Sequence, residues 1–171
     1  MGHIAQIVTA PFVLSRLYAE GVTKGIKAEN FARKPEGIDL NHPAFNFGHL
    51  AVYPDRILEM LGRSDLARPD QKYIDWFSAG KPCLDDPGCK VYPGMEEIMV
   101  RFYERYDTVV EVVRACDDDV LLQPNPSQSE RMRTFFPSLG MMLSFLLDGH
   151  CQTHIGQVSA WRRCMGLPSA F

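Results

Sequence analysis

The sequence feature that most constrains the fold is a long stretch without an internal proline, from Pro137 to Met165, in which apolar residues recur at helical spacing. Pro137 suits the first turn of a helix, and residues 166–168 (Gly-Leu-Pro) are a typical stop signal. A helix of this length can bury its apolar side only against other elements of the fold. The architecture therefore depends on what the preceding residues supply.

Three earlier segments, 3–20, 41–62 and 94–115, have apolar residues at the same helical spacing. The connections at 21–40 and 63–93 contain glycine, proline and charged residues and are predicted to be long crossing loops. No segment predicts a convincing β-strand. Four long helices with two long crossings predict an all-α fold, and specifically a four-helix bundle.

Local signals place several of the expected boundaries. In the segment 41–62, Asn41 is predicted to be the N-cap and Pro43 a first-turn residue. Pro54 cannot donate a hydrogen bond to the carbonyl of Leu50, so this helix should bend within about a turn after His49. Within the 63–93 connection, only residues 71–79 form a short helical candidate.

Length and composition narrow the class of protein. A chain of 171 residues fits one domain, 1–171. Its 18 basic and 21 acidic residues form no basic stripe, which argues against nucleic acid as a partner. No signal peptide or membrane-spanning run is recognisable, so we expect a cytoplasmic protein without a membrane partner. The five cysteines are scattered without a C-x-x-C pair, so neither disulfides nor a cysteine zinc site is predicted.

The last helical segment contains two histidines, His150 and His154, four residues apart. Residues at this spacing lie about 40° apart around a helix, so both imidazoles project from one face. That spacing suits two ligands of one metal ion, and a third ligand must come from another segment. His49 in the segment 41–62 is the candidate, provided that the two helices are neighbours. Each histidine could instead be an ordinary hydrogen-bonded or surface residue.

Other residues at helical spacing could support such a site. Asn46 precedes His49 by three residues, Tyr53 follows it by four, and Gln157 follows His154 by three. These side chains are candidates to orient the ligands or a substrate, although each could equally be a polar interhelical or exposed residue. Glycines in helix interiors, Gly48 and Gly156, indicate either a close helix approach or room for a bound group.

Two motifs resemble those of the DinB/YfiT-like family. Residues 46–50 (Asn-Phe-Gly-His-Leu) are similar to the family's first histidine motif, although Phe47 replaces a frequent tryptophan. Residues 150–158 (His-Cys-Gln-Thr-His-Ile-Gly-Gln-Val), with the Gly-Leu-Pro ending, are similar to its second motif, where Ile155 replaces a common arginine. The resemblance implies a four-helix bundle, often a homodimer, with a divalent metal ion on His49, His150 and His154.

The resemblance also implies an activity. Members with an assigned chemistry are metal-dependent transferases or related isomerases that use a low-molecular-weight thiol, so the expected function is thiol S-transfer to a small electrophile, with zinc or nickel as the metal ion. A metal-dependent hydrolase is a variant of this metal-dependent enzyme hypothesis. The alternative is a non-catalytic dimeric bundle that has a structural metal or binds a small ligand.

Overall fold

The computed structural model describes residues 2–170, and all regular secondary structure in this range is helical. An isolated bridge between Pro124 and Ser138 is the one extended pairing among these residues. The prediction of an all-α fold is therefore confirmed. None of the helices described is long and apolar enough to cross a membrane.

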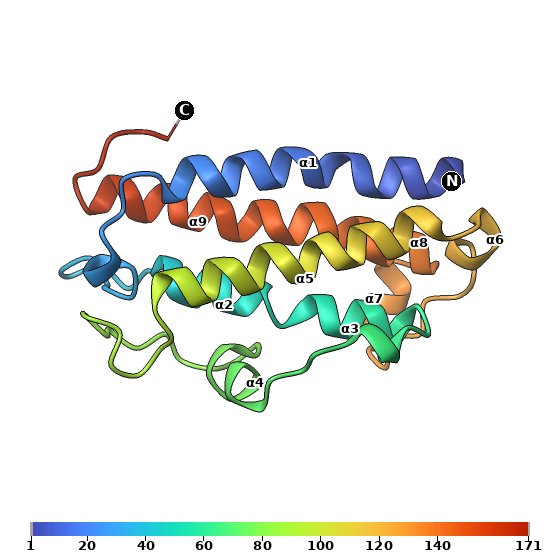
Figure 1. Ribbon diagram of the computed structural model, residues 1–171, viewed down its shortest axis with the longest axis horizontal. Coiled ribbons are helices and arrows are strands. Elements are labelled where there is room, and N and C mark those ends of the chain that lie inside the picture. The colour runs from blue at the N-terminus through green and yellow to red at the C-terminus, as the bar shows by residue number, and fades with distance from the viewer. Residues whose placement is uncertain (1, 171) are drawn as a thin grey trace.

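The longest helices run alongside one another (Figure 1). Helix α1 (His3–Thr23) packs against α5 (Met95–Ala115) and α9 (His150–Cys164). Helix α2 (Pro43–Leu50) packs against the same two helices, α5 and α9. The buried apolar residues of these helices belong to one core cluster. The packing of α2 against α9 meets the condition under which His49 can approach the other two histidines.

The segment 41–62 forms two helices rather than the single bent helix expected. Helix α2 ends at Leu50, and α3 (Tyr53–Met60) begins after Ala51 and Val52 with Pro54 in its first turn. Proline tolerates this position because the amide N–H that it lacks would have no partner there. The predicted cap is also shifted by one residue, since the N–H of Phe45 donates to Nδ1 of His42, not to Asn41.

The segment 137–165 forms a nearly continuous helical rod with a change of pitch. Helix α8 (Leu139–Ser144) is capped by Ser138, whose hydroxyl accepts a hydrogen bond from the N–H of Met141. A π-helical turn, η3 (Phe145–Gly149), follows and leads directly into α9. Sequence periodicity did not predict this turn, although π-turns inside helices are frequent at functional sites.

The connections contain several short helices. Two 3₁₀ turns, Ala28–Asn30 and Ser64–Leu66, interrupt the first and second long connections. Helix α4 (Gln71–Phe77) is the short helix expected at 71–79. Helices α6 (Asp118–Leu121) and α7 (Glu130–Phe135) lie between α5 and α8. The α6 residue Asp118 accepts hydrogen bonds from the N–H groups of His3 and Ile4, and so supports the start of α1.

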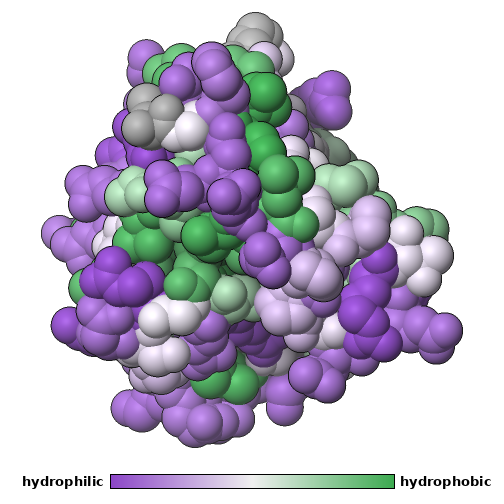
Figure 2. All heavy atoms as spheres, turned by 90° about the vertical axis from the view of Figure 1, so that its right-hand side faces the viewer, coloured by the Kyte–Doolittle hydropathy of each residue, from purple (hydrophilic) through white to green (hydrophobic). Residues whose placement is uncertain are grey.

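Several large apolar residues are exposed on the surface, where a regular amphipathic helix would have polar residues. On α1, residues that the helical spacing grouped with the core are exposed: Ile7 by 71%, Leu14 by 47% and Leu17 by 55%. Figure 2 shows apolar side chains gathered at the end of the molecule where α1 begins and α6 to α8 lie. Large exposed apolar residues of α6 to α8 and their ends are Val120, Leu122, Phe135 and Met141.

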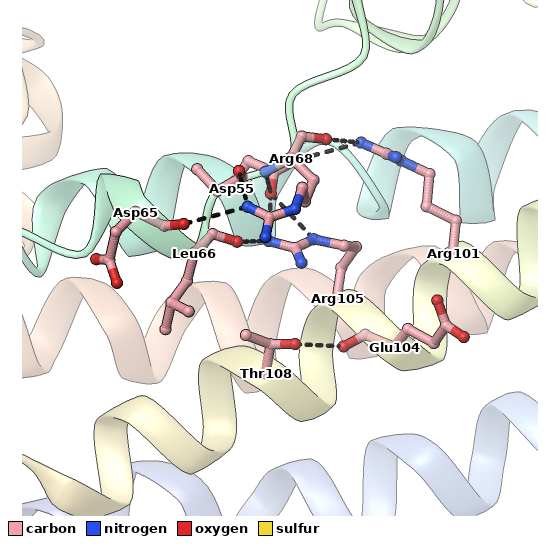
Figure 3. Close-up of polar contacts among 9 residues, drawn as sticks. Asp55, Asp65, Leu66, Arg68, Arg101, Glu104, Arg105 and Thr108 are labelled. Atoms are coloured by element: carbon pink, nitrogen blue, oxygen red, sulfur yellow. Dashed lines mark hydrogen bonds and ion pairs between the residues drawn. The ribbon is translucent and has the colours of Figure 1, made fainter.

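A buried carboxylate links α3 to α5 and to the loop that follows α3. Asp55 is 4% exposed, and its two oxygens accept from Arg101 (Nη2, 3.1 Å) and Arg105 (Nη2, 2.6 Å). The N–H of Arg68 also donates to Asp55, at 2.9 Å. Both guanidinium groups bond loop carbonyls as well, that of Leu66 for Arg105 and that of Arg68 for Arg101 (Figure 3).

Candidate metal centre

Three histidines from two helices converge. His49 comes from the last turn of α2, and His150 and His154 from the first turns of α9. The ring centroid of His49 lies 5.2 Å from that of His150 and 4.7 Å from that of His154, and the latter two are 4.8 Å apart. One nitrogen atom from each ring lies within 4.8 Å of the other two. The predicted ligand set is therefore brought together in space and could bind a metal ion.

The ring of His49 is oriented by a backbone carbonyl. Its Nδ1 lies 2.6 Å from the oxygen of Phe77, the last residue of α4. Because a carbonyl oxygen only accepts, Nδ1 must carry the proton and donate it, which leaves the lone pair on Nε2. Metal-binding histidines are commonly held in this way. The Phe77 carbonyl was not predicted from the sequence.

The ring of His154 is oriented by Asn46. Its Nδ1 lies 2.8 Å from Oδ1 of Asn46, while Nδ2 of Asn46 donates to the carbonyl oxygens of Asn41 and His42 at 3.1 and 3.2 Å. These two bonds fix which end of the amide faces the imidazole, so Asn46 presents an acceptor and Nδ1 of His154 donates. Nε2 of His154 again keeps its lone pair.

The ring of His150 has a different environment. Its Nδ1 is buried and has no hydrogen-bond partner in the structure. The ring lies between two aromatic rings, with centroid distances of 4.4 Å to Tyr53 and 5.8 Å to Phe145. A buried nitrogen without a partner is unfavourable, and each such group in a folded protein calls for an explanation, of which an absent metal ion or water is one. The residues present thus fit a divalent ion.

The remaining candidates have different positions. Tyr53 lies against the site, since its ring centroid is 5.0 Å from that of His49. Gln157 does not bond an imidazole; its Oε1 accepts instead from Nδ2 of Asn41 at 3.4 Å. Helical spacing placed Gln157 on the same helix as His150 and His154. It could not show that Asn41 lies opposite Gln157.

The two helix-interior glycines also differ. A Cβ on Gly48 would lie 2.6 Å from the ring of Phe77, so this glycine permits the close approach that brings the Phe77 carbonyl to His49. A Cβ on Gly156 would meet nothing within 4 Å. The sequence analysis gave a close helix approach as one of two explanations for Gly48, but it did not indicate that α4 is the element that approaches.

Burial keeps the three imidazoles uncharged. Loss of solvation lowers the pKa of His150 to about 4 and that of His154 to about 3, and lowers the pKa of His49 as well. Mutual repulsion of the three rings, if charged, acts in the same direction on His150 and His154. At neutral pH all three rings are therefore neutral imidazoles that carry one proton each, which is the form that binds metal ions.

Comparisons with protein-family models, curated proteins and solved structures find no match to this chain. The interpretation of the site therefore depends on its own geometry. Among residues 2–170, these histidines are the one group of three potential His, Cys, Asp or Glu ligands close enough to share an ion.

The lowered pKa values predict how the metal-free protein responds to acid. In the unfolded chain a histidine pKa returns to about 6.5, so between about pH 6.5 and 4 the unfolded state binds more protons than the folded state. The free energy of unfolding should therefore fall across this range as the pH is lowered. Urea unfolding at several pH values measures it. His150→Gln should flatten the dependence, because it removes one of the groups whose pKa burial lowers.

The hydrogen bond from His154 to Asn46 predicts an effect on metal affinity. Asn46→Ala removes the acceptor that fixes the His154 tautomer, and we expect zinc affinity to fall about 10- to 100-fold. Competition with a chromogenic chelator measures this. Gln157→Ala is the matched control, because Gln157 bonds Asn41 and should leave zinc affinity within about twofold of the wild type. Equal losses in both variants would contradict the assignment of Asn46.

Proposed function

We propose that His49, His150 and His154 bind a divalent metal ion, zinc or nickel, and that this ion serves an enzymatic reaction on small molecules. The observation that carries the proposal is the convergence of three neutral imidazoles, two of them with Nδ1 committed to an oxygen acceptor. Three neutral ligands leave the ion its full charge and at least one open coordination position, a pattern typical of catalytic rather than structural zinc.

The favoured reaction is transfer of a low-molecular-weight thiol to a small electrophile. A divalent ion in this position supplies Lewis acidity, which lowers the pKa of a thiol or water bound to it. The chain contributes the orientation of the ligands through Phe77 and Asn46, and an aromatic wall through Tyr53. Metal-dependent hydrolysis is the variant in which water replaces the thiol.

The resemblance to the DinB/YfiT-like family supports this choice and extends it to the fold. We propose that α1, the pair α2 and α3, α5, and the rod from α8 to α9 are the four members of a DinB-like bundle. The packing of α1 and of α2 against both α5 and α9 supports this arrangement.

Turnover with a thiol panel tests the transferase proposal. Zinc- or nickel-loaded protein is mixed with bacillithiol, mycothiol or glutathione and a chromogenic chloronitrobenzene, where a carbon–sulfur bond forms and chloride leaves. We expect metal-dependent turnover with at least one thiol and none with His154→Ala. Metal binding without turnover of any thiol, or of an ester in the hydrolase variant, would instead support the non-catalytic alternative.

We further propose that the exposed face of α1 pairs with a second copy of the chain. Ile7, Ala10, Leu14 and Leu17 are exposed and follow a 3-4-3 spacing that reads the same in both directions. An antiparallel copy would therefore place Ile7 opposite Leu17 and Ala10 opposite Leu14, as a two-fold interface requires. Sedimentation velocity should give a homodimer that Leu14→Glu converts to a monomer. The exposed Leu122 lies outside α1, so Leu122→Glu should remain dimeric.

A further inference from the structure

A cavity of about 570 Å³ lies between α3 and the part of the helical rod that consists of α8 and η3. On the α3 side it is lined by Tyr53, Arg56, Glu59 and Met60, and on the rod side by Met142 and Leu146. The connection at residues 126–128 forms its remaining wall. The volume lies in the range of small-molecule sites, and most of the side chains that α3 and the rod supply are apolar.

The cavity lies beside two of the three histidines, His49 and His150. Tyr53 lines it, and the ring of Tyr53 also contacts those of His49 and His150, with centroid distances of 5.0 and 4.4 Å. Along the rod, Met142, Leu146, His150 and His154 follow one another at intervals of four residues. None of the three histidines lines the cavity, and the side chain of Tyr53 lies between it and the rings of His49 and His150.

Arg56 supplies a positive charge to this cavity. Its guanidinium lies 5.4 Å from the centroid of the Tyr53 ring. No carboxylate among residues 2–170 lies within 4 Å of it, in contrast to Arg101 and Arg105, which are paired with Asp55. Glu59 also lines the cavity, one helical turn farther from Tyr53. Its spacing of three residues makes it a neighbour of Arg56 on the helix surface, but the two side chains form no ion pair within 4 Å.

We propose that the cavity binds an apolar carboxylic acid as the substrate of the metal centre, with its carboxylate on Arg56 and its hydrocarbon part on Met60, Met142 and Leu146. The assignment rests on the proposed function, since it places the substrate beside the metal ligands. Arginine binds carboxylates through paired N–H donors. The positive charge of a metal ion on the histidines would also favour an anion at the end of the cavity where Tyr53 and Arg56 lie. From Tyr53 to Met60 the helix rises by about 10 Å, a length that suits octanoate as a probe.

Calorimetric titration of octanoate into metal-free protein tests the proposal apart from the metal. We expect binding that is at least about 10-fold tighter than that of octanol, because a hydrogen bond to a charged group contributes about 1.5–3 kcal/mol. Arg56→Met should weaken octanoate binding by a similar factor without weakening zinc binding, because the Arg56 charge acts on His49 in the same sense as it would on a bound cation, by repulsion. The exposed Arg163 does not line the cavity, so Arg163→Met is the matched control and should bind octanoate normally.

The possible failures are distinguishable. Equal affinity for octanoate and octanol, or octanoate binding that Arg56→Met leaves intact, would overturn the role of Arg56. Octanoate binding that appears only with zinc and ignores Arg56→Met would place the carboxylate on the metal and overturn the proposal as well. Absence of zinc binding in a separate titration would instead count against the proposed function, whatever the result with octanoate.

Discussion

Replacement of His154 by alanine should lower the affinity for zinc by at least about 100-fold, because a change in the groups around a metal ligand alone costs 10- to 100-fold. The variant retains two imidazoles, of which only His49 keeps its hydrogen bond to a backbone carbonyl. Equilibrium dialysis with elemental analysis measures the loss. The matched control is Thr153→Ala, since Thr153 is exposed and its hydroxyl donates a hydrogen bond to the carbonyl of Gly149, the last residue of η3.

Bound zinc in both His154→Ala and the control would contradict a three-histidine site. The melting temperature of the wild type with and without zinc adds a second criterion. A structural ion contributes its binding energy to folding, so its removal should lower the melting temperature strongly. A melting temperature that changes little on removal of zinc would favour the catalytic interpretation over the structural one.

Replacement of Asp55 by alanine should lower the free energy of unfolding by about 3–5 kcal/mol, the usual effect of breaking a buried ion pair by removing one partner. The variant leaves Arg101 and Arg105 without their shared carboxylate, although their side chains are only 18% and 11% exposed. It also removes the acceptor of the Arg68 N–H in the loop after α3. Urea unfolding monitored by circular dichroism measures the change.

Asp65 provides the comparison for Asp55. Asp65 pairs with Arg63 at 2.9 Å, but both side chains are largely exposed. Exposed pairs of this kind contribute about 0–1 kcal/mol, so Asp65→Ala should have little effect. If Asp55→Ala and Asp65→Ala destabilise the protein equally, the buried network does not hold α3 against α5.

The sequence predicted the parts of the site that depend on one helix. Helical spacing placed His150 and His154 on one face, and the structure brings His49 to them across the contact between α2 and α9. Spacing reports which residues share a face, not what lies opposite. For that reason it could not show that Phe77 would accept from His49, or that Gln157 would face Asn41.

The errors in the fold have local causes. Pro54 was expected to bend one helix, but the missing N–H and the clash of its ring are relieved more fully when the helix ends and restarts with proline in a first turn. The cap moved from Asn41 to His42 because the His42 ring can both accept from the N–H of Phe45 and bond the carbonyl of Leu84. Helix α1 has apolar residues on its exposed side as well as on its buried side, so periodicity could not show which side faces the core.

The π-helical turn at Phe145–Gly149 has a consequence for how the chain tolerates changes of length. Each residue of an α-helix advances the side-chain direction by about 100°. A π-turn closes i→i+5 instead of i→i+4 hydrogen bonds, so it takes up about one residue more than an α-helical turn. Deletion of one residue within Phe145–Gly149 would therefore be absorbed by a return to α-helical winding, and His150 and His154 would still face His49. Deletion of one residue from α8 or α9 has no such reserve and would rotate the residues on its two sides relative to each other by about 100°.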